Sequence, residues 1–131
     1  MGESFLSDIP GEHVQVHPTD PLLAGDATEE QVVFVAPFAC VYTGTTVTPD
    51  ANVTGNTAAH KNLNVKVGGG AEIANLDLDT GTDLTAATET VVGSGLSQAL
   101  AKGASITIEF EQVGAGVAIP RSLFKSTFRP Q

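Results

Sequence analysis

The sequence is poor in the residue types that cross-linked folds and many binding sites need. It contains one cysteine, no tryptophan, one tyrosine and six basic side chains among 131 residues. One cysteine excludes a disulfide within the chain, which fits a reducing compartment, and a chain of this length can bury a core without cross-links. No apolar stretch approaches the length needed to span a membrane, so we expect no membrane partner.

Charge is unevenly distributed along the chain. The net charge is −9, and an acidic field repels the phosphate backbone, so we expect no nucleic-acid partner. Residues 1–31 carry seven carboxylates but no lysine, no arginine and no apolar run of the kind that a secretory signal contains. We therefore expect a soluble protein made in a cytoplasm. Its prolines and its lack of a sustained period predict that residues 1–30 form an extended acidic arm, followed by one domain over residues 31–131.

Alternation of apolar and polar residues predicts strands. The clearest case is ASITIEFEQ, residues 104–112, and the pattern recurs in NLNVKV and ANLDLD. Runs of β-branched and aromatic residues predict further strands in QVVFVAP, CVYTGTTVT and SLFKSTF. Because turn-forming glycine, proline and aspartate separate these segments, the fold class is all-β, an antiparallel sandwich or barrel. Only SQALAK, residues 97–102, could form a helical turn.

The single cysteine, Cys40, lies among aromatic and β-branched neighbours in FVAPFACVYTG. A catalytic thiol needs a nearby base, and none of the three histidines lies in a recognisable nucleophile motif. We therefore predict that Cys40 fills a core or an interface. His13 and His17 have the four-residue spacing of zinc ligands on a helix, but Pro18 and the valines between them favour extended chain, which disfavours a zinc site.

Three aspartates resemble part of a calcium-binding loop. Asp77, Asp79 and Asp83 take its first, third and seventh places, but the strict sixth and twelfth places hold Thr82 and Thr88 instead of glycine and glutamate. A weak surface calcium site stays open as an alternative. The stretch VGGGAE lacks the following helix that a phosphate-binding loop requires. With no carboxylate pair, triad or metal cluster, the sequence predicts neither an enzyme nor a cofactor.

Three short motifs carry a resemblance to a known family. Together with the strand pattern over residues 31–128, they resemble the head decoration, or minor capsid, proteins of tailed bacteriophages of actinobacteria. The motifs are VAPF at residues 35–38, VTPDA at residues 47–51 and VGAGVAIP at residues 113–120. The chain departs from the family at two turns, having Gly-Ala at residues 103–104 instead of Gly-Asp and Arg-Ser at residues 121–122 instead of Gly-Gly.

The resemblance implies a jelly-roll-like β-sandwich that binds the outside of an assembled capsid and stabilises it. It implies synthesis in the bacterial host cytoplasm, a place on the virion exterior, the phage major capsid protein as partner, and a homotrimer at a threefold or quasi-threefold position. Many copies of a rigid module that each bridge several subunits stabilise a shell through multiplicity.

Apolar and basic residues are the expected contacts. Exposed ion pairs contribute only about 0 to 1 kcal/mol each, so apolar anchors must provide much of the affinity of an acidic arm for a basic groove on the capsid. The expected capsid contacts are Phe5, Leu6, Ile9, Leu22 and Leu23. The run VVFV at residues 32–35 is apolar on both sides, and the basic C-terminal end could pair with the arm of a neighbouring protomer. The expected subunit contacts are Phe34, Arg121, Lys125 and Arg129.

The rival hypothesis is a virion-surface module that binds a host ligand or glycan. Its site would lie in loops such as residues 50–60 or 79–84. Glycan sites usually present aromatic rings for stacking, whereas this chain has no tryptophan and its one tyrosine, Tyr42, lies in a predicted strand. The structural role is therefore the favoured hypothesis.

Overall fold

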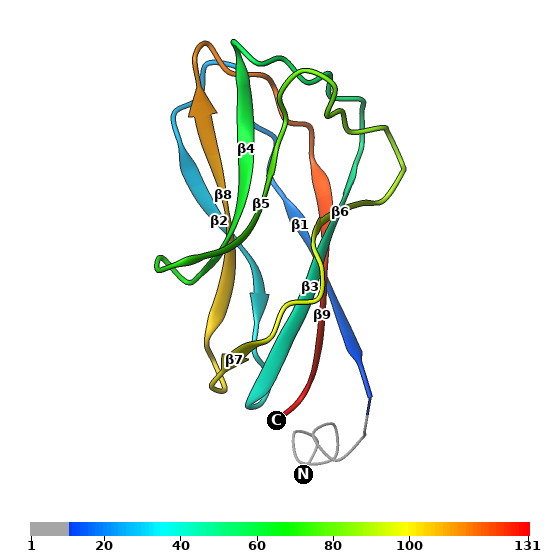
Figure 1. Cartoon of the computed structure of the whole chain (residues 1–131), viewed down its shortest axis with the longest axis vertical. Coiled ribbons are helices and arrows are strands. Elements are labelled where there is room, and N and C mark those ends of the chain that lie inside the picture. The colour runs from blue at the N-terminus through cyan, green and yellow to red at the C-terminus, as the bar shows by residue number, and fades with distance from the viewer. Residues whose placement is uncertain (1–10) are drawn as a thin grey trace.

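The computed structural model describes residues 11–131, which form β-strands joined by turns and loops and contain no helix (Figure 1). The strands are β1 (His13–Thr19), β2 (Glu29–Val35), β3 (Cys40–Pro49), β4 (His60–Val67), β5 (Glu72–Asp77), β6 (Thr90–Gly93), β7 (Gln98–Leu100), β8 (Ser105–Val113) and β9 (Ser122–Pro130). A helix able to cross a membrane is accordingly absent from residues 11–131.

The strands form two antiparallel sheets that pack face to face, which confirms the predicted all-β sandwich. One sheet has the order β1-β9-β3-β6, with β7 also paired to β3, and the other has the order β2-β8-β4-β5. The loops that join β1 to β2, β3 to β4, β5 to β6 and β8 to β9 lie at the upper end of Figure 1, opposite the C-terminus. Residues 97–102, which could have formed a helical turn, do not, because Gln98–Leu100 pairs with the start of β3.

Alternation explains the core. On β8, Ile106, Ile108 and Phe110 are fully buried, whereas the polar residues between them point to the outer side of the sheet. Phe124 and Phe128 of β9 fill the space between the sheets from the other side. The core is therefore one layer of side chains between two sheets, as the period of two in the sequence predicts.

The predicted arm is wrong for residues 13–30. Residues His13–Thr19 pair with β9 along their whole length, and β2 begins at Glu29, so this part of the chain belongs to the sandwich. The sequence pattern misleads because it is inverted: Val14 and Val16 are exposed on the outer face, whereas Gln15 between them is half-buried. Pro18 is tolerated because β1 is an edge strand. The remaining arm contacts, Phe5, Leu6 and Ile9, lie outside the described residues.

Two glutamines close the side of the sandwich where the edge strands β1 and β2 meet. The Gln15 amide donates to the carbonyl of Val35 and accepts from its N–H, both at 3.2 Å. In the same way, the Gln31 side chain accepts from the N–H of Asp20 at 2.8 Å and donates to its carbonyl at 3.3 Å. Each side-chain amide pairs with main chain as another strand would, so it satisfies part of an otherwise open edge.

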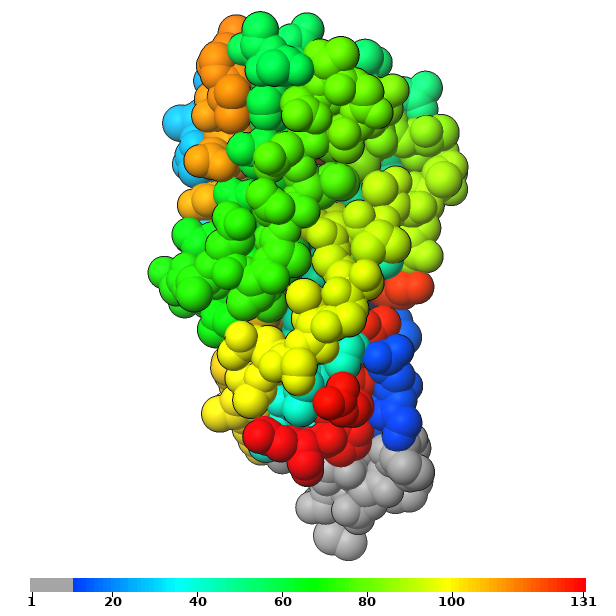
Figure 2. All heavy atoms as spheres, viewed as in Figure 1, coloured from blue at the N-terminus to red at the C-terminus, as the bar shows by residue number. Residues whose placement is uncertain are grey.

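At the opposite side of the sandwich, β5 packs against β6. Figure 2 shows these strands and β7, in green to yellow, running down the surface next to one another. Gly93 permits this approach, because a Cβ atom there would lie 2.6 Å from the Cβ of Ala74. Both open sides of the sandwich are thus closed by particular residues, which leaves the outer faces of the two sheets and the loop end as broad surfaces.

Candidate functional site

The outer face of the β1-β9-β3-β6 sheet carries exposed apolar side chains. We name it the Val–Thr face. One register row crosses four strands in the order Val16, Lys125, Thr46 and Val91. Val16 is 52% exposed and Val91 is 55% exposed. The neighbouring rows add further exposed apolar side chains, Val14 on β1 and Leu123 on β9. Aliphatic side chains left in water along one sheet face are typical of a surface that another molecule covers.

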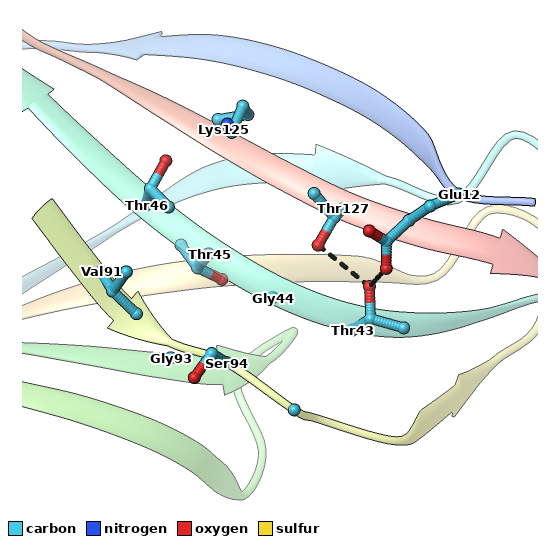
Figure 3. A pocket seen from close by; sticks show the side chains of 11 residues that line it. Glu12, Thr43, Gly44, Thr45, Thr46, Val91, Gly93, Ser94, Lys125 and Thr127 are labelled. Atoms are coloured by element: carbon cyan, nitrogen blue, oxygen red, sulfur yellow. Dashed lines mark hydrogen bonds between the residues drawn. The ribbon is translucent and has the colours of Figure 1, made fainter. Parts of the chain in front are cut away.

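A hollow of about 230 Å³ lies in the Val–Thr face between β9, β3 and β6 (Figure 3). Gly44 has no side chain to fill the hollow, and a Cβ atom there would lie only 3.0 Å from the Thr127 hydroxyl. At one end the Thr43 hydroxyl donates to Glu12 at 2.7 Å and lies 2.9 Å from the Thr127 hydroxyl. Lys125 projects at the other end. The lining therefore offers hydroxyl, carboxylate and ammonium groups.

The outer face of the other sheet carries a network of polar side chains on β4 and β8, with the exposed valines Val32 and Val35 on its edge strand β2. We name it the Asn–Glu face. The Asn64 amide donates to Glu109 at 2.9 Å and to Glu111 at 3.2 Å, and Lys66 donates to Glu109 at 3.2 Å. These hydrogen bonds, from Asn64 first and then Lys66, lower the pKa of the Glu109 carboxyl below its ordinary value of 4.5. The polar groups of the Asn–Glu face largely satisfy one another, and this surface is suited to contact with water.

The three C-terminal cations lie at or near the Val–Thr face, and two of them have partners within the chain. Lys125 donates to Glu89 at 2.8 Å, which lowers the pKa of that carboxyl. Arg121 lies 3.7 Å from Asp50. By the alternation of β9, Arg129 points outward on the same side as Lys125, and it is exposed. Neither of these two ion pairs uses a carboxylate of the first thirty residues.

Two of the expected contact residues are buried within the protomer. Phe34 is 0% exposed, so the expectation that it contacts another subunit is wrong. The reason is a β-bulge between Val32 and Phe34, which turns both Val33 and Phe34 into the core. Leu22 is 3% exposed, so it cannot anchor on a capsid as expected. Its neighbour Leu23 is 73% exposed and remains available for such a contact.

The loops considered for ligand binding are tied to each other. The Gly55 N–H donates to the Asp83 carboxylate at 2.7 Å, and Thr57 and Thr80 exchange main-chain and side-chain hydrogen bonds. A Cβ atom at Gly55 would overlap the carbonyl oxygen of Asp79. These contacts hold the loops between β3 and β4 and between β5 and β6 as one rigid unit.

The candidate metal ligands and the thiol have other roles in the part of the chain that the structure describes. Among residues 11–131, no group of three or more His, Cys, Asp or Glu side chains is placed to hold a metal ion, and Asp77 and Asp83 have other hydrogen-bond partners. Cys40 is fully buried, and burial raises the pKa of its thiol above 9.0, so the packing interpretation is confirmed.

The sequence reasoning did not identify the exposed valines of the Val–Thr face. Val14 and Val16 alternate with polar residues in HVQV, as in a strand. The usual assumption that the apolar residues of a strand face the core would, however, have placed them in the interior. Val91 lies in a four-residue strand that the pattern did not predict. Comparisons of the chain with protein-family models, with curated proteins and with solved structures find no match.

Proposed function

We propose that this chain is a decoration, or minor capsid, protein that binds the outer surface of an assembled bacteriophage head and stabilises it. The observation that carries the proposal is the difference between the two sheet faces. On the Val–Thr face, exposed valines and a leucine are spread over β1, β9 and β6. On the Asn–Glu face, the exposed valines Val32 and Val35 lie only on the edge strand β2, and a hydrogen-bonded polar network covers β4 and β8. A rigid module that lies on a shell needs one face for the shell and one for water.

The partner that we propose for the Val–Thr face is the phage major capsid protein. On this face the carboxylates of Glu12 and Glu89 are balanced by Lys125 and Arg129, although the whole chain carries a net charge of −9. A neutral, partly apolar patch on an acidic protein can approach another surface with little charge repulsion and little desolvation cost. The binding role requires no catalysis and no cofactor.

The strand order supports the finer parts of the proposal. Counting β6 and β7 as one strand, the chain passes between the sheets in a Greek-key path, which is the arrangement of a jelly roll. We propose that fold for the sandwich. A homotrimer on the virion exterior remains part of the proposal from the family resemblance, with synthesis in the bacterial host cytoplasm. Because Val33 and Phe34 are buried, only Val32 and Val35 of the apolar run at residues 32–35 remain available for a subunit contact.

Shells assembled from the major capsid protein of the same phage provide the test. Shells are mixed with the purified chain, binding is measured by co-sedimentation, and shell melting is followed by calorimetry. We expect saturable binding and a higher melting temperature of the shell. Val16→Glu should lower the affinity by about tenfold or more, because it places a charge at the centre of the contact. The matched control is Val32→Glu, on the Asn–Glu face. Failure of the native chain to bind shells would falsify the proposed function.

A glycan-binding role is the second candidate, and the hollow in the Val–Thr face favours it. Its lining includes the hydroxyls of Thr46 and Thr127, the Glu12 carboxylate and the Lys125 ammonium, which are groups that hydrogen-bond to sugars. The one tyrosine, Tyr42, is fully buried and cannot provide a stacking ring. A glycan array that gives specific binding, lost in a Thr46→Val variant, would support this role over the capsid role if shells melt at the same temperature with and without the chain.

A further inference from the structure

Lys61 is a fully buried lysine whose ammonium group is surrounded by oxygen atoms of uncharged groups. Its Nζ atom donates to the carbonyls of Leu23 at 3.2 Å, Ala24 at 3.1 Å and Asp26 at 3.4 Å, and to the side-chain oxygen of Gln112 at 2.6 Å. Burial lowers the pKa of the Lys61 amine from 10.5, and nearby carboxylates counteract this. One side chain of β4 thus holds three carbonyls of the loop between β1 and β2.

Further hydrogen bonds fix the same loop. Leu22 exchanges two main-chain hydrogen bonds with Ile119, at 2.8 and 2.9 Å. The Asp26 carboxylate accepts from the N–H of Leu23 at 2.8 Å, and the Gln112 amide donates to the carbonyl of Ala24 at 2.9 Å. Loops at the surface are usually mobile, but here most of the polar main-chain groups around Leu23 have fixed partners.

The fixed loop exposes an apolar side chain. Leu23 is 73% exposed, more than any other large hydrophobic residue in the described part of the chain, whereas the adjacent Leu22 is buried. Single exposed leucines are common, but this one is held by a buried ammonium group, and taking a charge out of water is costly unless every proton is bonded. A side chain presented in one geometry loses little conformational entropy when it binds.

We propose that Leu23 is a capsid-contacting anchor, separate from the Val–Thr face, and that Lys61 is the residue that positions it. The partner is an apolar pocket with a basic rim on a major capsid subunit. The basic rim follows from charge complementarity. Asp20, Asp26 and Glu29 lie within six residues of Leu23 in the sequence, and Lys61, which contacts this loop, is buried. A second, separate contact is what a protein needs in order to bridge two subunits.

This inference rests on the proposed function, and its test uses the same shells. Leu23→Ser should lower the affinity for shells by about tenfold and reduce the rise in shell melting temperature, because it removes an apolar anchor without touching the core. Lys61→Met should lower the affinity to a similar extent when Leu23 is present. Combined with Leu23→Ser, it should have no further effect, because Lys61 acts through Leu23. Hydrogen exchange at the amide of Leu23 should become faster in Lys61→Met.

Three controls make each outcome decisive. Val32→Ser, an exposed valine on the Asn–Glu face, should bind shells as the native chain does. Leu23→Met should restore binding, since it returns an apolar side chain of similar size. If Lys61→Met does not fold, Gln112→Met is used instead, because it removes one of the oxygen atoms that accept hydrogen bonds from the ammonium group. Native affinity in Leu23→Ser would overturn the anchor while leaving the proposed function intact, and an equal effect of Lys61→Met with and without Leu23 would overturn the positioning role.

Discussion

The hydroxyl of Tyr42 gives the sharpest test of how the core is held together. Tyr42 is fully buried, and its hydroxyl lies 2.6 Å from the hydroxyl of Thr45 and 2.8 Å from that of Ser126. Tyr42→Phe keeps the ring, which packs edge-on against Phe34 at 5.1 Å between ring centroids, and removes only the oxygen. The two partner hydroxyls are also buried, so water cannot easily replace the lost group.

The expected loss of stability follows from these contacts. A net contribution of about 1 kcal/mol for each buried hydrogen bond gives a loss of about 2 kcal/mol in the free energy of unfolding. An unfolding entropy of about 2.1 cal/mol/K per residue gives roughly 0.28 kcal/mol/K for 131 residues, so the melting temperature should fall by about 7 °C. Urea unfolding should show a lower midpoint with an unchanged slope.

A double-mutant cycle separates the hydrogen bonds from a general effect on packing. Ser126→Ala in the native background should also destabilise, but in the Tyr42→Phe background it should cost much less, because an apolar pair leaves no polar group unsatisfied. A melting temperature in Tyr42→Phe within about 1 °C of the native value, which at this size is below 0.5 kcal/mol, would refute the reasoning. Strict additivity in the cycle would show that the two hydroxyls do not act as a unit.

Three further variants test other parts of the fold. Gln15→Leu removes the amide that pairs with the main chain of β2, and should reduce the free energy of unfolding by about 1 to 2 kcal/mol in urea unfolding; native stability would contradict this role. Gly55→Ala should lower the melting temperature by several degrees, whereas Gly25→Ala, which has open space around it, should not; equal effects would contradict the overlap. Because the pKa of Glu109 is lowered in the folded state, its contribution is present above about pH 4.5 and lost as the pH falls through the folded pKa. Glu109→Gln should therefore show a weaker fall in melting temperature below pH 4.5, and an unchanged acid profile would contradict the assignment.

The sequence predicted most of the sandwich because the strands with one buried face obey a simple rule. In β8, β4 and β5 apolar residues alternate with polar ones, so periodicity alone located them. β1 was missed because its valines are exposed and Gln15 between them is half-buried, the reverse of the usual pattern. It is held by main-chain pairing with β9 and by the Gln15 amide, and neither depends on hydrophobic burial.

The candidate site was less predictable than the fold. The sequence nominated Leu22 and Leu23 together, and nothing in their order shows that one is buried and the other exposed. Phe34 was nominated from a run of apolar residues, and only the β-bulge at Val33 shows why consecutive side chains can both enter the core. The role of Lys61 could not be predicted from the sequence, because three of its hydrogen-bond acceptors are main-chain carbonyls of a loop about 35 residues earlier in the chain.

By itself the sequence determined the fold class, the acidic net charge and the inert environment of Cys40, because composition and local alternation decide these properties. The tertiary structure alone decided which surfaces are available. Whether Val14, Val16 and Val91 lie in a core or on an exposed face depends on which strand pairs with which, and that is a property of contacts between residues far apart in the chain. The same is true of the ammonium group of Lys61, which is satisfied only when the loop between β1 and β2 meets β8 around it.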